Sequence, residues 1–150
     1  MTDKMTILVG TVGQGIMRSP DSGETWRRLG IDQGLHTDAV VRTLAIHPKS
    51  PNTVHAGTER GLYRSDDAGD TWRLLEGPLR DYCVWALAID PQRPETMFAG
   101  TGTPAPARLF RSADGGITWD QRPLEAAENC INVGIPRVTG IAIDPSDTRM

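Results

Sequence analysis

One eight-residue pattern occurs three times in the chain and limits the fold more than any other feature of the sequence. The segment Ser19 to Trp26 has the form S-x-D-x-G-x-T-W, and the same form returns in Ser65 to Trp72 and in Ser112 to Trp119. The copies start at residues 19, 65 and 112, so they are 46 and 47 residues apart. A period of about 40 to 50 residues is typical of propeller blades or of helical arrays. The segments between the copies decide between these two architectures.

The intervening segments repeat as well. The runs 41–48, 84–91 and 138–145 are short β-branched and aliphatic stretches that end in His-Pro or Asp-Pro. They predict buried strands, because they are too short for helices and end in turn residues. Two more short apolar runs follow in each repeat, such as 54–58 and 61–65, and the Thr-Trp of the pattern begins a last one. Four short strands per repeat are the content of one propeller blade, so we expect an all-β propeller of four-stranded antiparallel blades.

The register of the repeats predicts where each blade lies. Blade 1 is expected over about 5–29 without its first strand, blade 2 over about 40–75, blade 3 over about 83–122, and the first strand of blade 4 over about 138–144. A closed propeller has typically four to eight blades. We therefore expect residues 1–150 to be an incomplete, N-terminal fragment of about three blades, with the remaining blades in a longer chain.

The residues of the pattern have a structural interpretation. The Asp can accept hydrogen bonds from backbone N–H groups two or three residues later, and the Gly can adopt a positive φ. The Ser and Thr hydroxyls can bond the backbone of the turn, and the Trp can pack between strands. These structural residues are Ser19, Asp21, Gly23, Thr25, Trp26, Ser65, Asp67, Gly69, Thr71, Trp72, Ser112, Asp114, Gly116, Thr118 and Trp119.

A calcium site is the alternative for the second copy, where Asp66, Asp67 and Asp70 lie close together. A helix-loop-helix calcium loop that began at Asp66 would have Ala68 at its third position and Gly77 at its twelfth, where oxygen ligands are needed. We therefore expect no metal ion, and no motif predicts a cofactor.

The chain resembles the Asp-box superfamily, also called BNR or sialidase-like repeats, because S-x-D-x-G-x-T-W is the signature of that repeat. Proteins with such repeats include sialidases, endoglucanases of the xyloglucanase type, sortilin-like receptors and photosystem assembly factors. The chain is most similar to bacterial proteins that are called glycosyl hydrolases on the repeat alone. The resemblance implies a propeller and places the boxes on the rim opposite the usual active site. It indicates no single reaction, since this fold hosts unrelated functions.

Charge and hydropathy exclude several classes of partner. The formal net charge is −3, and no basic cluster predicts binding to nucleic acid or to an anionic membrane. No segment has the roughly 18 consecutive apolar residues that span a bilayer. The N-terminus lacks the pattern of a secretory signal, so a cytoplasmic location is expected. Cys83 and Cys130 are expected to be reduced thiols.

Candidate ligand contacts lie in the loops of one face. In a propeller, ligands usually meet the links between blades, here 30–40, 76–83 and 123–137, and the turns between second and third strands. Arg42 and Trp85 occupy equivalent positions at the start of the innermost strand, at the mouth of the central channel. Polar candidates on this face are Asp32, His36, Asp38, Glu59, Arg60, Arg80, Asp81, Tyr82, Glu125, Glu128, Asn129 and Arg137. The residues selected as ligand-binding are Arg42, Trp85, Arg137, Asp81, Glu128 and His36.

Three functions remain open, and whether the chain is an enzyme is undecided. The favoured hypothesis is a scaffold that binds a carbohydrate or protein ligand through its loop face. The first alternative is a glycoside hydrolase, sialidase-like or xyloglucanase-like, which needs two carboxylates across the scissile bond. The resemblance to sialidases implies a Phe/Tyr-Arg-Ile-Pro element near the start, whereas Ile135, Pro136 and Arg137 have similar letters in another order and place. The second alternative is an assembly factor of the photosystem type. Acids available for a catalytic pair are Asp32, Asp38, Asp81, Glu125 and Glu128.

Overall fold

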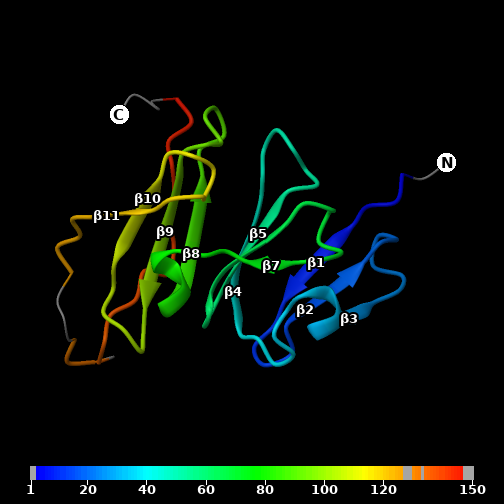
Figure 1. Cartoon of the computed structure of the whole chain (residues 1–150), viewed down its shortest axis with the longest axis horizontal. Helices are drawn as coiled ribbons and strands as arrows, with labels where there is room; N and C mark the ends of the chain where they lie inside the picture. The colour runs from blue at the N-terminus through cyan, green and yellow to red at the C-terminus, as the bar shows by residue number, and fades with distance from the viewer. Residues whose placement is uncertain (1–2, 127–129, 133, 147–150) are drawn as a thin grey trace.

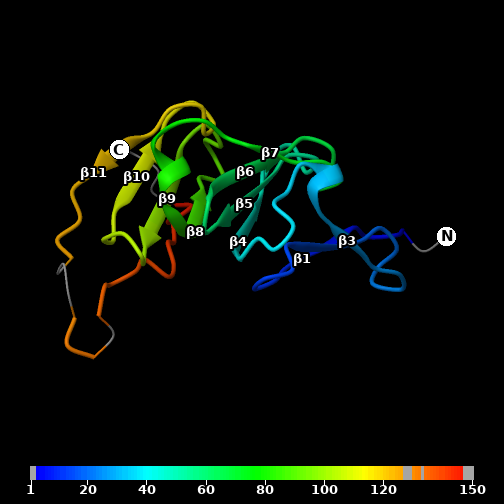
Figure 2. The same cartoon turned by 60° about the horizontal axis from the view of Figure 1, so that its bottom comes forward.

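The computed structural model describes residues 3–126, 130–132 and 134–146. Its strands form three antiparallel sheets that follow one another along the chain and lie side by side in both views (Figures 1 and 2). The helices of these residues are two 3₁₀ turns, η1 (Ile31–Gln33) and η2 (Pro78–Asp81). Neither is long and apolar enough to cross a membrane. The all-β class predicted from the repeats is confirmed.

The first sheet contains three strands in the order β1 (Ile7–Gly10), β2 (Ile16–Ser19) and β3 (Arg27–Leu29). Short antiparallel hairpins connect them, with Ile7 opposite Ser19 and Ile16 opposite Leu29. The Asp-box lies in the turn between β2 and β3.

The second sheet has the full set of four strands, because its repeat contains all four apolar runs. Their order is β4 (Val41–Ile46), β5 (Val54–Thr58), β6 (Gly61–Ser65) and β7 (Arg73–Leu74). All five residues of β5 are buried, which is expected for a strand covered on both faces by neighbouring blades.

The third sheet repeats this order with β8 (Cys83–Ile89), β9 (Met97–Gly102), β10 (Leu109–Ser112) and β11 (Asp120–Arg122). Strand β4 contacts β8, so the first strands of the second and third sheets lie next to one another, and β4 also contacts β1 of the first sheet. Sequential four-stranded sheets stacked in this way are blades, and the described residues form part of a β-propeller.

The stretch expected to begin a fourth blade, residues 138–144, differs from the expectation because it forms no strand. The Val138 N–H donates to the Thr101 carbonyl oxygen at 3.1 Å. No described strand pairs with this stretch, and a strand requires such a partner.

A glycine in each sheet permits the close approach of the next blade. A Cβ added to Gly57 would lie 2.8 Å from a Val84 methyl group and 2.8 Å from the Val84 carbonyl oxygen, which is closer than real contacts allow. The contact recurs around the propeller, with Gly10 against Val41, Gly57 against Val84, and Gly100 against Val138. Val138 therefore occupies the position of an innermost strand although no strand forms there.

The hydrophobic core lies between the sheets. One cluster joins Leu29 of the first sheet to Trp72 of the second, and the other joins Leu62 of the second sheet to Trp119 of the third. Trp26 is 43% exposed, since the first sheet has a neighbouring blade on only one side among the described residues. The box tryptophans thus hold adjacent blades together rather than the strands of one blade.

Candidate functional site

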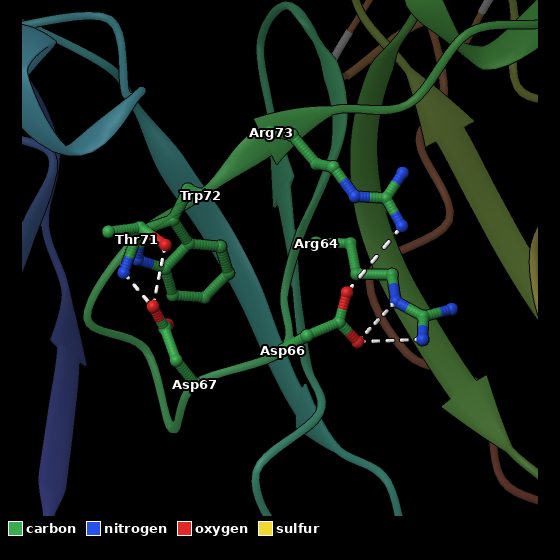
Figure 3. A pocket seen from close by; sticks show the side chains of 6 residues that line it. All are labelled: Arg64, Asp66, Asp67, Thr71, Trp72 and Arg73. Carbon is green, nitrogen blue, oxygen red and sulfur yellow. Dashed lines mark hydrogen bonds and ion pairs between the residues drawn. The ribbon is translucent and has the colours of Figure 1, made fainter.

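The Asp-box closes its turn with a compact set of hydrogen bonds (Figure 3). In the second box the Ser65 hydroxyl donates to the Asp67 carboxylate at 2.8 Å and accepts from the Gly69 N–H at 2.9 Å. Thr71 donates to Asp67 through its N–H at 2.8 Å and its hydroxyl at 2.6 Å. The Trp72 indole N–H donates to the Gly69 carbonyl oxygen at 3.1 Å. The backbone donors to Asp67 are Asp70 and Thr71, three and four residues later, not two and three as expected.

These bonds keep the box carboxylates charged. Hydrogen bonds from Thr25 lower the pKa of Asp21 to about 2, and those from Thr118 lower the pKa of Asp114 to about 2. Burial opposes the effect but is weaker. Both oxygens of the Asp21 carboxylate and of the Asp114 carboxylate accept hydrogen bonds within the turn.

On the opposite face, two of the predicted ligand contacts lie at β-bulges. Arg42 is the extra residue of β4 between Val41 and Thr43, and Trp85 is the extra residue of β8 between Val84 and Ala86. A bulge turns its side chain away from the regular alternation of the strand. The two bulges thus place Arg42 and Trp85 at equivalent positions at the start of the innermost strands of blades 2 and 3.

Three of the predicted residues come together there. The Arg42 guanidinium carbon lies 4.0 Å from the centre of the Trp85 ring, and that of Arg137 lies 4.8 Å from it. Both distances are within the range of cation–π attraction. The Trp85 indole N–H points to the Thr103 carbonyl oxygen at 3.5 Å. We call this arrangement the Arg–Trp stack, and neither of its guanidiniums has an ion-pair partner among the described residues.

The surroundings of the Arg–Trp stack are partly buried. Burial raises the pKa of the Cys83 thiol, and the adjacent Arg42 guanidinium opposes this rise. The Glu59 carboxylate accepts a hydrogen bond from the Val40 N–H at 2.6 Å and so holds the link that leads into β4. A hollow of about 130 Å³ beside Arg42 is also lined by Val41. Gly10, Thr43 and Leu44 complete the lining of this hollow, which lies on the blade 1 side of Arg42.

The other predicted contacts are not joined to the Arg–Trp stack. His36 is exposed in the link after η1, and Asp81 is the exposed last residue of η2. Neither forms a hydrogen bond or ion pair with the Arg–Trp stack in the described part of the chain. Glu128 and Asn129 lie outside the described residues. Of the acids considered for a catalytic pair, Asp38 forms an ion pair with Arg28 at 3.0 Å.

One buried polar residue was not recognised from the sequence as more than a strand position. His55 on β5 is 1% exposed, and neither ring nitrogen has a hydrogen-bond partner among the described residues. Burial lowers the pKa of His55 to about 4, and the charge of Arg64 acts in the same direction. The sequence indicates that this position is unusual, because the equivalent positions of the other repeats are apolar, Leu8 and Phe98.

Comparison with known proteins identifies the repeat and the fold. The model of the BNR/Asp-box repeat matches residues 110–121, and no curated protein sequence matches the chain. Among solved structures, an ancestral GH74 enzyme is similar with a TM-score of 0.65 and 20% identity over 77% of this chain. YCF48 bound to D1 peptide is similar with a TM-score of 0.57 and 19% identity over 79% of this chain. The GH74 xyloglucanase from Xanthomonas campestris has a TM-score of 0.50 and 19% identity over 95% of this chain.

The comparisons support the resemblance to BNR-type propellers, including proteins of the glycosyl hydrolase type, and the incomplete propeller fold. The chain spans 16%, 38% and 32% of the lengths of these three structures. At such low identity the likeness establishes the fold alone.

Proposed function

We propose that this Asp-box propeller is a binding scaffold that holds a carbohydrate or protein ligand on its loop face, centred on Arg42, Trp85 and Arg137. The Arg–Trp stack is the observation that supports the proposal. Three side chains from separate segments converge there, and neither arginine forms an ion pair with an acid among the described residues. Arginine and tryptophan are also the residue types that contribute most to binding interfaces.

The chemistry of the Arg–Trp stack favours a ligand with carboxylate, phosphate or sulfate groups, or one rich in carbonyl oxygens. A guanidinium offers five N–H donors and no acceptor. The cation–π contacts orient these donors without using them. A peptide or an acidic oligosaccharide meets this requirement.

The experiment is a binding assay of the chain against arrays of oligosaccharides and of synthetic peptides. We expect a ligand whose affinity falls at least tenfold in Arg42→Gln and in Trp85→Ala. Arg122→Gln is the matched control, because Arg122 is an exposed arginine on β11 without an ion pair among the described residues. Failure of every ligand to bind, or equal losses in the control, would refute the proposal.

Glycoside hydrolysis is the alternative that the likeness in fold to GH74 enzymes favours. It requires a pair of carboxylates at the loop face, with Asp32, Asp38, Asp81 and Glu125 as the candidates within the described residues. Turnover of xyloglucan or of a sialoside that is lost on Asp81→Asn would establish it in place of simple binding.

Assembly of other proteins is the second alternative, since YCF48 is bound to a peptide in its structure. It narrows the ligand of the leading proposal to a protein. Selective binding of peptides over oligosaccharides on the two arrays would favour it.

A further inference from the structure

We call the contact region between two neighbouring blades a joint. On the Asp-box rim, the joint of blades 1 and 2 and the joint of blades 2 and 3 have different residues at equivalent positions. At the joint of blades 1 and 2, Asp70 in the box of blade 2 forms an ion pair with Arg27 of blade 1 and lies 3.9 Å from Arg18 of the same blade. Arg18 also donates to the Ala68 carbonyl oxygen at 3.3 Å. An acid of one blade thus forms ion pairs with two arginines of the blade before it.

At the joint of blades 2 and 3, arginines are present at the positions equivalent to Arg18 and Arg27, but no acid is present at the position equivalent to Asp70. Arg64 and Arg73 of blade 2 take the places of the two arginines, whereas Ile117 of blade 3 takes the place of Asp70. The Ile117 side chain is 73% exposed, so it does not fill the joint. Both arginines turn instead to Asp66 of their own blade, at 2.7 Å from Arg64 and 3.5 Å from Arg73.

The result is a hollow of about 240 Å³ between the two arginines and the box turn of blade 3. Figure 3 shows a neighbouring pocket that the same two arginines line, where their guanidiniums lie beside Asp66 and Trp72 lies on the other side of that carboxylate. Arg64 donates two hydrogen bonds to Asp66, whereas Arg73 donates none within the described part of the chain. The remaining N–H groups of both arginines are therefore available to a ligand.

A buried polar side chain, that of His55, also lies at this joint. Nε2 of His55 lies 3.8 Å from the place of a Cβ on Gly116, which lines the hollow. At the other joint Leu8 holds the equivalent place against Gly69. The joint of blades 2 and 3 therefore contains a buried imidazole, with both nitrogens unbonded among the described residues, where the other joint contains a leucine.

The other acid at the hollow does not compete for the arginines. Glu76 accepts a hydrogen bond from Arg80 at 2.6 Å and forms an ion pair with it. With Glu76 paired with Arg80, the charges of Arg64, Arg73 and Asp66 sum to one net positive charge on the blade 2 side of the hollow. On the blade 3 side the Asp114 carboxylate is hydrogen-bonded within its own turn.

We propose that the groove between blades 2 and 3, lined by Arg64, Arg73 and the turn Gly115–Ile117, is a binding site for a carboxylate group supplied by a ligand. The carboxylate takes the place that Asp70 occupies at the other joint. Arginine binds carboxylates through parallel N–H donors, and such charge-assisted bonds are the stronger ones in proteins. This site lies on the Asp-box rim, so it is independent of the ligand proposed for the loop face.

The test is an NMR titration of the ¹⁵N-labelled chain with sodium acetate, compared with sodium chloride at equal ionic strength. We expect saturable shifts of the Nε–Hε signals of Arg64 and Arg73 and of the backbone N–H of Ile117. Arg73→Gln should weaken binding at least fivefold, whereas Arg122→Gln should leave it unchanged. Shifts that match those in chloride would overturn the proposal.

Two exchange variants make the test independent of folding defects. Ile117→Asp supplies the carboxylate from within the chain, so acetate should no longer shift Arg64 and Arg73. Asp70→Ile removes it from the other joint, so acetate should begin to shift Arg18 in that variant. Retained acetate binding in Ile117→Asp would contradict the proposal.

The source of the carboxylate is distinguished by a second titration with a tetraglutamate peptide. Binding at least tenfold tighter than acetate would identify an acidic polypeptide as the ligand, and equal affinity per carboxylate would identify a small acid. Either result supports the site. Loss of binding in Arg42→Gln, which lies on the loop face, would count against it.

Discussion

Replacement of His55 by leucine should stabilise the protein and remove much of its sensitivity to mild acid. His55 is 1% exposed and its pKa is lowered from 6.5 to about 4, mainly by burial and then by the charge of Arg64. Arg73 and His47 lower it further, and Asp66 partly opposes them. The folded state therefore binds its proton less readily than the unfolded state.

The sign and size of the effect follow from this difference. Above pH 6.5 the imidazole is neutral in both states, so there is no penalty from titration. As the pH falls from 6.5 toward 4, the unfolded state takes up a proton that the folded state does not. A pKa lowered from 6.5 to about 4 corresponds to a loss of stability of about 2 kcal/mol at pH 5 and about 3 kcal/mol below pH 4.

Leucine is the suitable replacement because Leu8 holds the equivalent position in blade 1. At pH 7, His55→Leu should raise the free energy of unfolding by about 1 to 3 kcal/mol, since two buried nitrogens without partners are removed. At pH 5 the difference from the wild type should be about 2 kcal/mol larger than at pH 7.

Urea unfolding followed by tryptophan fluorescence, at pH 7 and at pH 5, measures both quantities. His36→Leu is the control, because His36 is exposed and its replacement should leave the acid sensitivity of the wild type in place. Equal stability of the wild type at the two pH values, or an equal fall in His55→Leu, would show that His55 does not titrate as inferred.

Three further predictions concern the box and the joints. Ser65→Ala should cost about 1 to 3 kcal/mol by urea unfolding, because its buried hydroxyl bonds the carboxylate and two N–H groups of the turn. Gly57→Ala should cost about 2 kcal/mol or more, because its Cβ collides with the next blade, whereas Gly140→Ala should be neutral, since nothing lies within 4 Å of its Cβ. Asp21 and Asp114 should remain ionised in the folded protein until the pH approaches about 2. Their contribution to stability, complete above 3.8, should be lost as the pH falls through that range, and ¹³C NMR of the carboxyl carbons would show ordinary pKa values if this were wrong.

Most of the fold could be predicted from the repeat. The spacing of the three boxes and the apolar runs between them indicated the blades, because each blade is a local unit of hairpins whose strands are consecutive in sequence. The stretch 138–144 was the exception, because a strand needs a pairing partner as well as a suitable sequence.

The candidate site could be predicted in part. Comparison of equivalent positions in the repeat was enough to select Arg42 and Trp85, and the structure shows that both lie at β-bulges. Their stacking with Arg137, at 4.0 and 4.8 Å, depends on how blade 3 meets its neighbours and could not be derived from spacing. His36 and Asp81 fit the same sequence criteria, yet the structure does not join them to the stack.

The sequence by itself determined the contents of each blade, because the bonds of a box such as that between Asp67 and Thr71 span only four residues. Tertiary structure alone decided what happens between blades. Asp70 and Ile117 hold the same place in the repeat, but one bonds the arginines of the preceding blade and the other leaves a hollow beside them. His55 is likewise a strand residue in sequence and becomes a buried, unpaired imidazole only when blade 3 covers it. The reason is physical: burial and ion pairing depend on groups that are distant in sequence, and only the packing of whole blades brings those groups into contact.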